Sequence, residues 1–100
     1  MAVHTVKVLT GGVVDVQSVK AKKPNPSAGN VGDQVQWTPA GPGATSYRIV
    51  FGPDNPFSGN NFPVPSGPQS VREDAADGVH NYDVTNSAGG VLADPDVDVE

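Results

Sequence analysis

The chain of 100 residues contains no cysteine, which excludes disulfide bonds, thiolate-ligated metal sites and a cysteine nucleophile. Basic residues are also few: 6 lysines and arginines stand against 11 aspartates and glutamates, for a net charge of −5. This balance argues against nucleic acid as a partner, because phosphate binding depends on Lys and Arg. No apolar run approaches the ~18 residues of a membrane-spanning helix. These absences leave a small acidic domain with neither thiolate chemistry nor a membrane span.

A helical apolar stripe is missing as well. The nearest candidate, residues 70–78, has too few apolar side chains to bury one face of a helix. We also expect no secretory signal, since residues 3–9 alternate in polarity where a signal would have a basic region and then an apolar one. We therefore expect either a cytoplasmic protein or the mature form of an exported one.

Alternating apolar residues, which are typical of strands with one buried face, recur along the chain. The predicted strands are residues 3–9, 14–21 with a bulge near Ser18, 34–38, 46–51, 79–85, and a last strand with Val97 and Val99 pointing inward. Clusters of Gly, Pro, Asn and Ser between them form turns. This pattern predicts one all-β domain over residues 1–100, a Greek-key β-sandwich of about seven to eight strands.

The proline-rich segment 54–68 interrupts this pattern. Proline removes a backbone donor from the strand ladder, so residues 54–67 cannot form a central strand. We expect a long surface connection packed by Phe57 and Phe62. If these two side chains are exposed, they form the preferred contact for a partner.

Charge is distributed unevenly between the two ends. Residues 1–23 carry a net +3, whereas residues 71–100 carry a net −7. We expect the two ends to lie beside each other, on adjacent edge or parallel strands, so that their charges offset. An acidic surface for a basic partner is the alternative.

Three segments, in order along the chain, carry a family resemblance. Residues 31–37 resemble the Gly-Asp-x-Val-x-Trp entry to a central strand of the cupredoxins, the plastocyanin-like domains. Residues 46–51 resemble that family's Pro-His-x-Val-x-Phe strand, and residues 78–84 resemble its Gly-x-Tyr-x-Phe/Tyr-x-Cys strand. The resemblance spans residues 31–99 and implies a cupredoxin-like fold.

The copper ligands that the resemblance would imply are missing. The first histidine of the family corresponds to Tyr47, the cysteine corresponds to Val84, and residues 85–91 contain neither His nor Met. Type 1 copper needs a thiolate and two imidazoles, so we expect a cupredoxin-like domain without this site. Tyr47 and Val84 are expected to fill the vacated space, and the Tyr47 hydroxyl could bond a partner or a water.

Other metal chemistry has weaker candidates. His80 shares the inward face with Tyr82 and Val84, which favours a core position, while His4 with the terminal amine of Met1 could hold copper or zinc adventitiously. The C-terminal acids do not follow the EF-hand pattern, and we expect them to solvate an edge strand, with a weak calcium site as the alternative. These acids are Asp94, Asp96, Asp98 and Glu100.

Catalytic motifs are absent, since no serine lies in a Gly-x-Ser-x-Gly elbow and no glycine pair precedes a helix that could bind phosphate. We expect a non-enzymatic module without a cofactor, acting in protein interaction or self-association through loops on a rigid β-sandwich. The candidate contact residues are Tyr47, Phe57, Phe62, Asn86 and Ser87. The alternative is a metal-binding or redox accessory protein that uses His4, His80 or the C-terminal acids.

Overall fold

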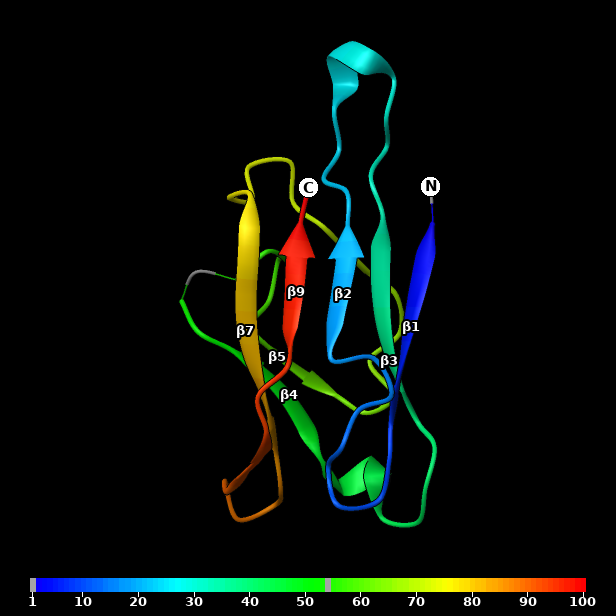
Figure 1. Cartoon of the computed structure of the whole chain (residues 1–100), viewed down its shortest axis with the longest axis vertical. Coiled ribbons are helices and arrows are strands. Elements are labelled where there is room, and N and C mark those ends of the chain that lie inside the picture. The colour runs from blue at the N-terminus through cyan, green and yellow to red at the C-terminus, as the bar shows by residue number, and fades with distance from the viewer. Residues whose placement is uncertain (1, 54) are drawn as a thin grey trace.

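Nine strands in two mixed sheets make up the computed structural model, which describes residues 2–53 and 55–100 (Figure 1). The first sheet has the order β1 (Val3–Val8), β3 (Gln34–Pro39), β6 (Gln69–Ser70). The second has the order β2 (Ser18–Ala21), β9 (Asp96–Val99), β7 (Gly78–Thr85), β4 (Arg48–Phe51), β5 (Asn61–Pro63), and β8 (Val91–Ala93) also pairs with β7. The all-β prediction is confirmed, with nine strands in place of seven to eight. Within the described ranges, no helix is long and apolar enough to cross a membrane.

Each sheet contains one parallel strand pair. β1 runs parallel to β3, and β2 runs parallel to β9, while the other pairs are antiparallel. Lys20 of β2 lies opposite Asp98 of β9, so the basic and acidic ends of the chain do lie side by side. The expectation that the C-terminal acids solvate an edge strand is wrong, because β9 lies between β2 and β7. Asp96 and Asp98 are half-buried on its solvent side.

Local turns shift the start of two predicted strands. In the predicted strand 14–21, only Ser18–Ala21 is a strand, and Val14 makes an isolated bridge to Val8. In the predicted strand 46–51, a short 3-10 turn (Ala44–Ser46) comes first, and the Tyr47 N–H donates to the Ala44 carbonyl. β4 therefore begins at Arg48.

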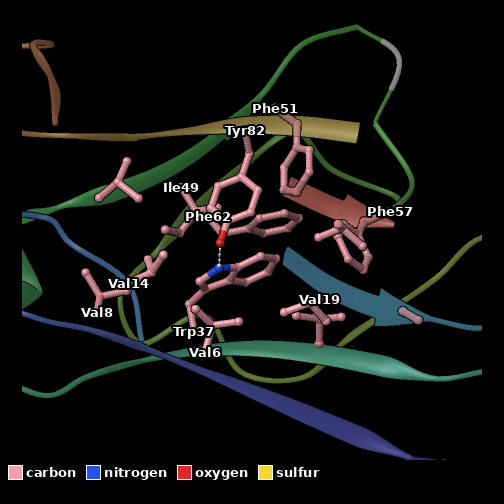
Figure 2. Close-up of a cluster of buried hydrophobic side chains, with 14 of the residues drawn as sticks. Val6, Val8, Val14, Val19, Trp37, Ile49, Phe51, Phe57, Phe62 and Tyr82 are labelled. Carbon is pink, nitrogen blue, oxygen red and sulfur yellow. Dashed lines mark hydrogen bonds between the residues drawn. The ribbon is translucent and has the colours of Figure 1, made fainter. Parts of the chain in front are cut away.

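Trp37 lies at the centre of the core between the sheets (Figure 2). Its ring packs against four other aromatic rings with centroids 5.4 to 6.0 Å away, those of Phe51, Phe57, Phe62 and Tyr82. The Trp37 indole N–H donates to the Tyr82 hydroxyl at 3.1 Å and so joins β3 of one sheet to β7 of the other. Burial raises the pKa of Tyr82 to about 12.

The proline-rich segment contributes to this core. The first residue of the segment, Asp54, lies outside the described residues. The segment also contains β5, at the edge of the second sheet. Phe57 is 1% exposed and Phe62 is 7% exposed, so both pack under the connection as predicted. Their expected role as a contact surface is wrong, because aromatic side chains of this size gain more from burial against Trp37 than from exposure.

Candidate interaction surface

Three loops lie at the end of the molecule drawn lowest in Figure 1: residues 9–13, 40–47 and 86–90. We call this region the loop end. Two hydrogen bonds connect the first two loops, because the Thr10 hydroxyl donates to the Pro42 carbonyl at 3.0 Å and the Gly11 N–H donates to the Tyr47 hydroxyl at 3.0 Å. These two loops, which are distant in the sequence, are therefore held together.

Tyr47 and Val84 occupy the positions that the resemblance assigns to copper ligands. Val84 is fully buried opposite Ile49 in the β4–β7 register, and the half-buried Tyr47 ring packs against the same core. The Tyr47 hydroxyl accepts the bond from Gly11, so it binds its own chain. Both side chains therefore pack carbon into this end of the core.

Asn86 and Ser87 form the turn between β7 and β8. The Asn86 side-chain oxygen accepts hydrogen bonds from the N–H groups of Ala88 at 3.0 Å and Gly90 at 2.8 Å. Gly89 has a φ of 84°, a conformation that favours glycine. Asn86 therefore shapes the turn, while Ser87 is exposed at its surface.

Three apolar side chains in or next to the loop end are exposed, and they were not predicted. Val13 is 55% exposed, Val91 is 59% exposed and Leu92 is 37% exposed. The backbone of Gly12, at a φ of 83°, packs so closely on Leu92 that a Cβ there would lie 2.5 Å from the Leu92 Cβ. Val13 is thereby placed near β8. The signal in the sequence was the adjacent pair Val91 and Leu92, since two neighbouring side chains on a strand cannot share one buried face.

The structure separates the residues proposed for metal binding. His80 is 6% exposed on the core face of β7, where its Nε2 donates to the Ala76 carbonyl at 2.7 Å. Asp96 and Asp98 lie on the opposite, solvent face of the same sheet, and His4 lies in the other sheet. Across residues 2–53 and 55–100, no three His, Asp or Glu side chains group as a metal site would require. The terminal amine of Met1 lies outside the described residues.

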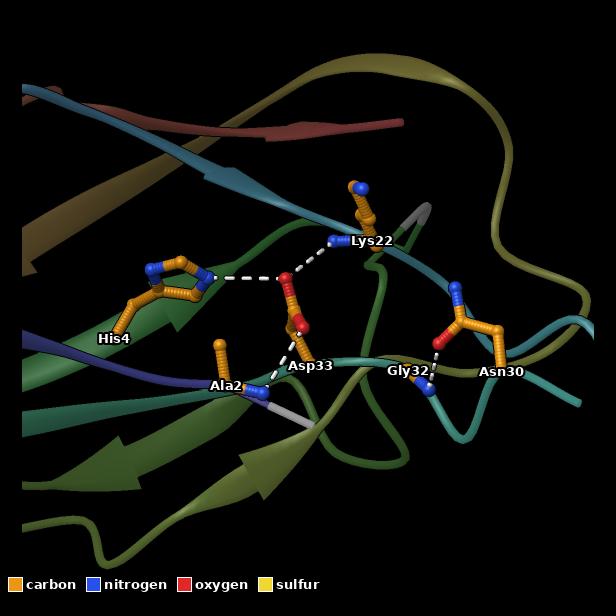
Figure 3. Close-up of polar contacts among 6 residues, drawn as sticks. All are labelled: Ala2, His4, Lys22, Asn30, Gly32 and Asp33. Atoms are coloured by element: carbon orange, nitrogen blue, oxygen red, sulfur yellow. Dashed lines mark hydrogen bonds and ion pairs between the residues drawn. The ribbon is translucent and has the colours of Figure 1, made fainter.

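Asp33 holds the ends of several strands together (Figure 3). Its carboxylate accepts hydrogen bonds from the Ala2 N–H at 3.2 Å, the Lys22 N–H at 3.0 Å and the His4 ring at 3.0 Å. Burial acts to raise the pKa of Asp33, but the bonds from Lys22, His4 and Ala2 outweigh it, so the net pKa is lowered. The preceding Gly32 has a φ of 82°, a backbone conformation that favours glycine. The cross-link from Asp33 to the neighbouring strands was not predicted.

A groove of about 730 Å³ lies at the end opposite to the loop end, beside the hairpin of residues 24–31. Its lining carries both charges, including Lys22, Glu73 and Glu100. Within this lining, the Lys23 ammonium forms an ion pair with the Asp77 carboxylate at 2.7 Å. Because the groove carries charges of both signs and one of its lysines is already paired, it indicates no particular class of ligand. We therefore take the loop end as the candidate surface.

Comparisons of this chain with protein-family models, with curated proteins and with solved structures find no match.

Proposed function

We propose that this chain is a copper-free, cupredoxin-like Greek-key β-sandwich that acts as a non-enzymatic protein-interaction module, with the loop end as its contact surface. The resemblance supports the fold, since its three segments supply Trp37, Phe51 and Tyr82, which pack together in one core. Tyr47 and Val84, at the positions of two copper ligands, are part of that core and support the copper-free form.

The observation that carries the proposal is the exposure of Val13 in the 9–13 loop and of Val91 and Leu92 in β8, next to the loop end, where Gly12 packs on Leu92. Apolar side chains grouped on a surface favour contact with another protein. Loops that are already ordered lose less conformational freedom when they bind, which increases affinity. The loop end thus combines apolar area with a preorganised backbone.

The two groups with clearly shifted pKa values act in the fold. Among the described residues, the pKa values that clearly depart from their usual range belong to Asp33 and Tyr82. Both groups make hydrogen bonds that stabilise the fold, and neither belongs to the loop end. Perturbed pKa values cluster at catalytic sites, and such a cluster would favour an enzyme.

Size-exclusion chromatography with light scattering tests the proposal. We expect the purified protein, or the protein in an extract of its source cells, to elute in a complex larger than the monomer. The Leu92→Ser and Val91→Ser substitutions should return it to monomer mass, whereas Val79→Ser should not, because Val79 is 60% exposed on β7 outside the loop end. Monomer mass in both preparations, or equal effects at all three positions, would contradict the proposal.

Addition of copper(II) tests the copper-free assignment. With a tyrosine and a valine in place of two ligands, we expect no intense visible charge-transfer band. An intense blue or green species would show that another set of side chains supplies the site.

A further inference from the structure

The loop end and the adjoining strand β8 are uncharged. Not one of residues 9–13, 40–47 and 86–93 is charged, whereas 17% of the whole chain is. Residues 86–93 include β8, so this uncharged region contains the exposed Val91 and Leu92 as well as Val13. The central part of a protein interface is depleted of charged residues in the same way.

Charged residues begin directly outside this region. Four exposed ones lie within two residues of its segments along the chain: Lys7, Asp15, Arg48 and Asp94. Protein interfaces commonly have such a polar rim around a less polar centre. The loop end therefore has the charge pattern of a contact surface, and the charge pattern also indicates its partner.

The polar groups of the loop end are largely bonded within it. Four of its side chains form hydrogen bonds with backbone groups of the same three loops: Thr10, Ser46, Tyr47 and Asn86. The backbone N–H groups of Gly12, Ala44 and Gly89 donate to carbonyls of their own loops. Burial of a polar group is costly when it loses water without gaining a partner. Because these groups already have partners, the loop end can be covered at a lower cost.

An uncharged surface fits a second copy of the same chain. In a two-fold contact both copies use the same surface, so a charged residue near the axis faces a like charge. The chain has a net charge of −5, and two copies repel each other unless the contact keeps their charges apart. The outer face of the second sheet lacks this property, because the exposed Val79 lies opposite Asp98 in the β7–β9 register.

The size of the loop end determines how strong such a contact is. The molecule measures 43 × 23 × 18 Å, and the loop end lies at one end of the long axis (Figure 1). A cross-section of 23 × 18 Å offers about 400 Å² per copy, or about 800 Å² in total, which is less than the roughly 1,200–2,000 Å² of stable complexes. A contact of this size is weak and reversible.

We propose that two copies of this chain pair through their loop ends in a weak two-fold dimer. Val13, Val91 and Leu92 of each copy are shielded from water in this dimer, and the charged remainder of each copy points away from the contact. The proposal rests on the proposed function, since it names the partner of the same surface.

Sedimentation equilibrium of the purified full chain tests the dimer. Between about 10 μM and 1 mM, we expect the average mass to rise from that of the monomer toward that of the dimer. Because no charged residue lies within the contact, an increase in sodium chloride from about 0.1 to 0.5 M should not weaken the association.

A matched pair of variants locates the contact. Val91→Asp places two like charges in the dimer and should lower the association constant at least about tenfold. Val79→Asp is the control, because it adds the same charge at a valine of nearly equal exposure, 60% against 59%, and should leave the association constant unchanged. If Val91→Asp does not fold, Ser87→Asp replaces it, since Ser87 is exposed on the turn before β8 and should give the same loss.

Three results would overturn the dimer. The purified wild type could remain monomeric at 1 mM, the variants at positions 91 and 79 could weaken association equally, or the association constant could fall as the salt concentration rises. The proposed function is tested separately in source-cell extract. A complex there that depends on Leu92, together with a monomeric purified protein, would overturn the dimer and leave the interaction module standing.

Discussion

Replacement of Asp33 by asparagine tests whether one carboxylate holds three strand ends together. The side chain is 14% exposed and accepts hydrogen bonds from Ala2, Lys22 and His4. Asparagine keeps one acceptor oxygen but places an NH₂ group where the second oxygen was. Either the Lys22 N–H or the Ala2 N–H then faces a donor.

The expected cost follows from these bonds. A hydrogen bond to a charged group contributes about 1.5–3 kcal/mol, and a buried donor left unpaired costs about 1–3 kcal/mol. The hydrogen bonds of Asp33 share one carboxylate, so their contributions do not simply add, and the remaining oxygen of asparagine retains part of them. We therefore expect Asp33→Asn to lower the free energy of unfolding by about 2–3 kcal/mol. For a domain of this size, the melting temperature falls by roughly 10–20 °C.

Urea denaturation and thermal circular dichroism measure this change. The matched control is Asp77→Asn, which removes an ion pair of a side chain that is 71% exposed and should cost less than about 1 kcal/mol. The lowered pKa of Asp33 adds a pH dependence. Its stabilising contribution is present above the usual value of 3.8 and is lost as the pH falls through the lower folded value.

The difference between wild type and Asp33→Asn should therefore be largest at neutral pH and shrink below about pH 4. Equal costs for Asp33→Asn and Asp77→Asn would refute the reasoning. So would a stability difference that does not change as the pH falls.

Three further predictions concern the core and the loop end. Tyr82→Phe should lower the free energy of unfolding, measured by urea denaturation, by about 1–3 kcal/mol, because the Trp37 N–H loses its acceptor. Burial raises the pKa of Tyr82 from 10.0 to about 12, so the wild type should also lose stability as the pH rises through that range. Phe57→Ala should cost about 3–5 kcal/mol, because Phe57 is a core residue. Gly12→Ala should cost at least ~1 kcal/mol more than Gly11→Ala, since both have positive φ but a Cβ meets a neighbouring side chain only at Gly12.

Each of these has a contradicting result. Tyrosinate absorbance that shows Tyr82 ionising near pH 10 in the folded protein would contradict its burial. A Phe57→Ala variant as stable as the wild type would place that ring at the surface. Equal melting temperatures for Gly11→Ala and Gly12→Ala would contradict the close contact between the 9–13 loop and β8.

The strands with clean alternation could be predicted from the sequence because their side chains obey a local rule. Residues 34–38 and 79–85 place Val35, Trp37, Tyr82 and Val84 inward, and all four are buried in the same core.

The features that were missed depend on the order of strands in space. Asp96 and Asp98 alternate with valines in a manner typical of an edge strand, yet β9 is flanked on both sides because the distant strand β2 pairs with it. Likewise, the exposure of Val91 and Leu92 depends on a short strand that pairs only with the end of β7. Neither pairing can be deduced from residues near it in the sequence.

Only part of the candidate site could be predicted from the sequence. The loop end was indicated by Tyr47 and by the turn at Asn86, but both side chains bind their own chain in the structure. Phe57 and Phe62 were offered as contacts on the condition of exposure, which depends on whether a neighbour covers them. Trp37 does so, and it arrives from a segment about twenty residues away.

Photo-crosslinking from the loop end tests the central claim most directly. A photoreactive amino acid at position 91 is compared with the same amino acid at position 79, since Val91 and Val79 are 59% and 60% exposed. We expect a discrete crosslinked species at position 91, in the purified protein or in source-cell extract, and none at position 79. Equal crosslinking at both positions, or none at either, would contradict it.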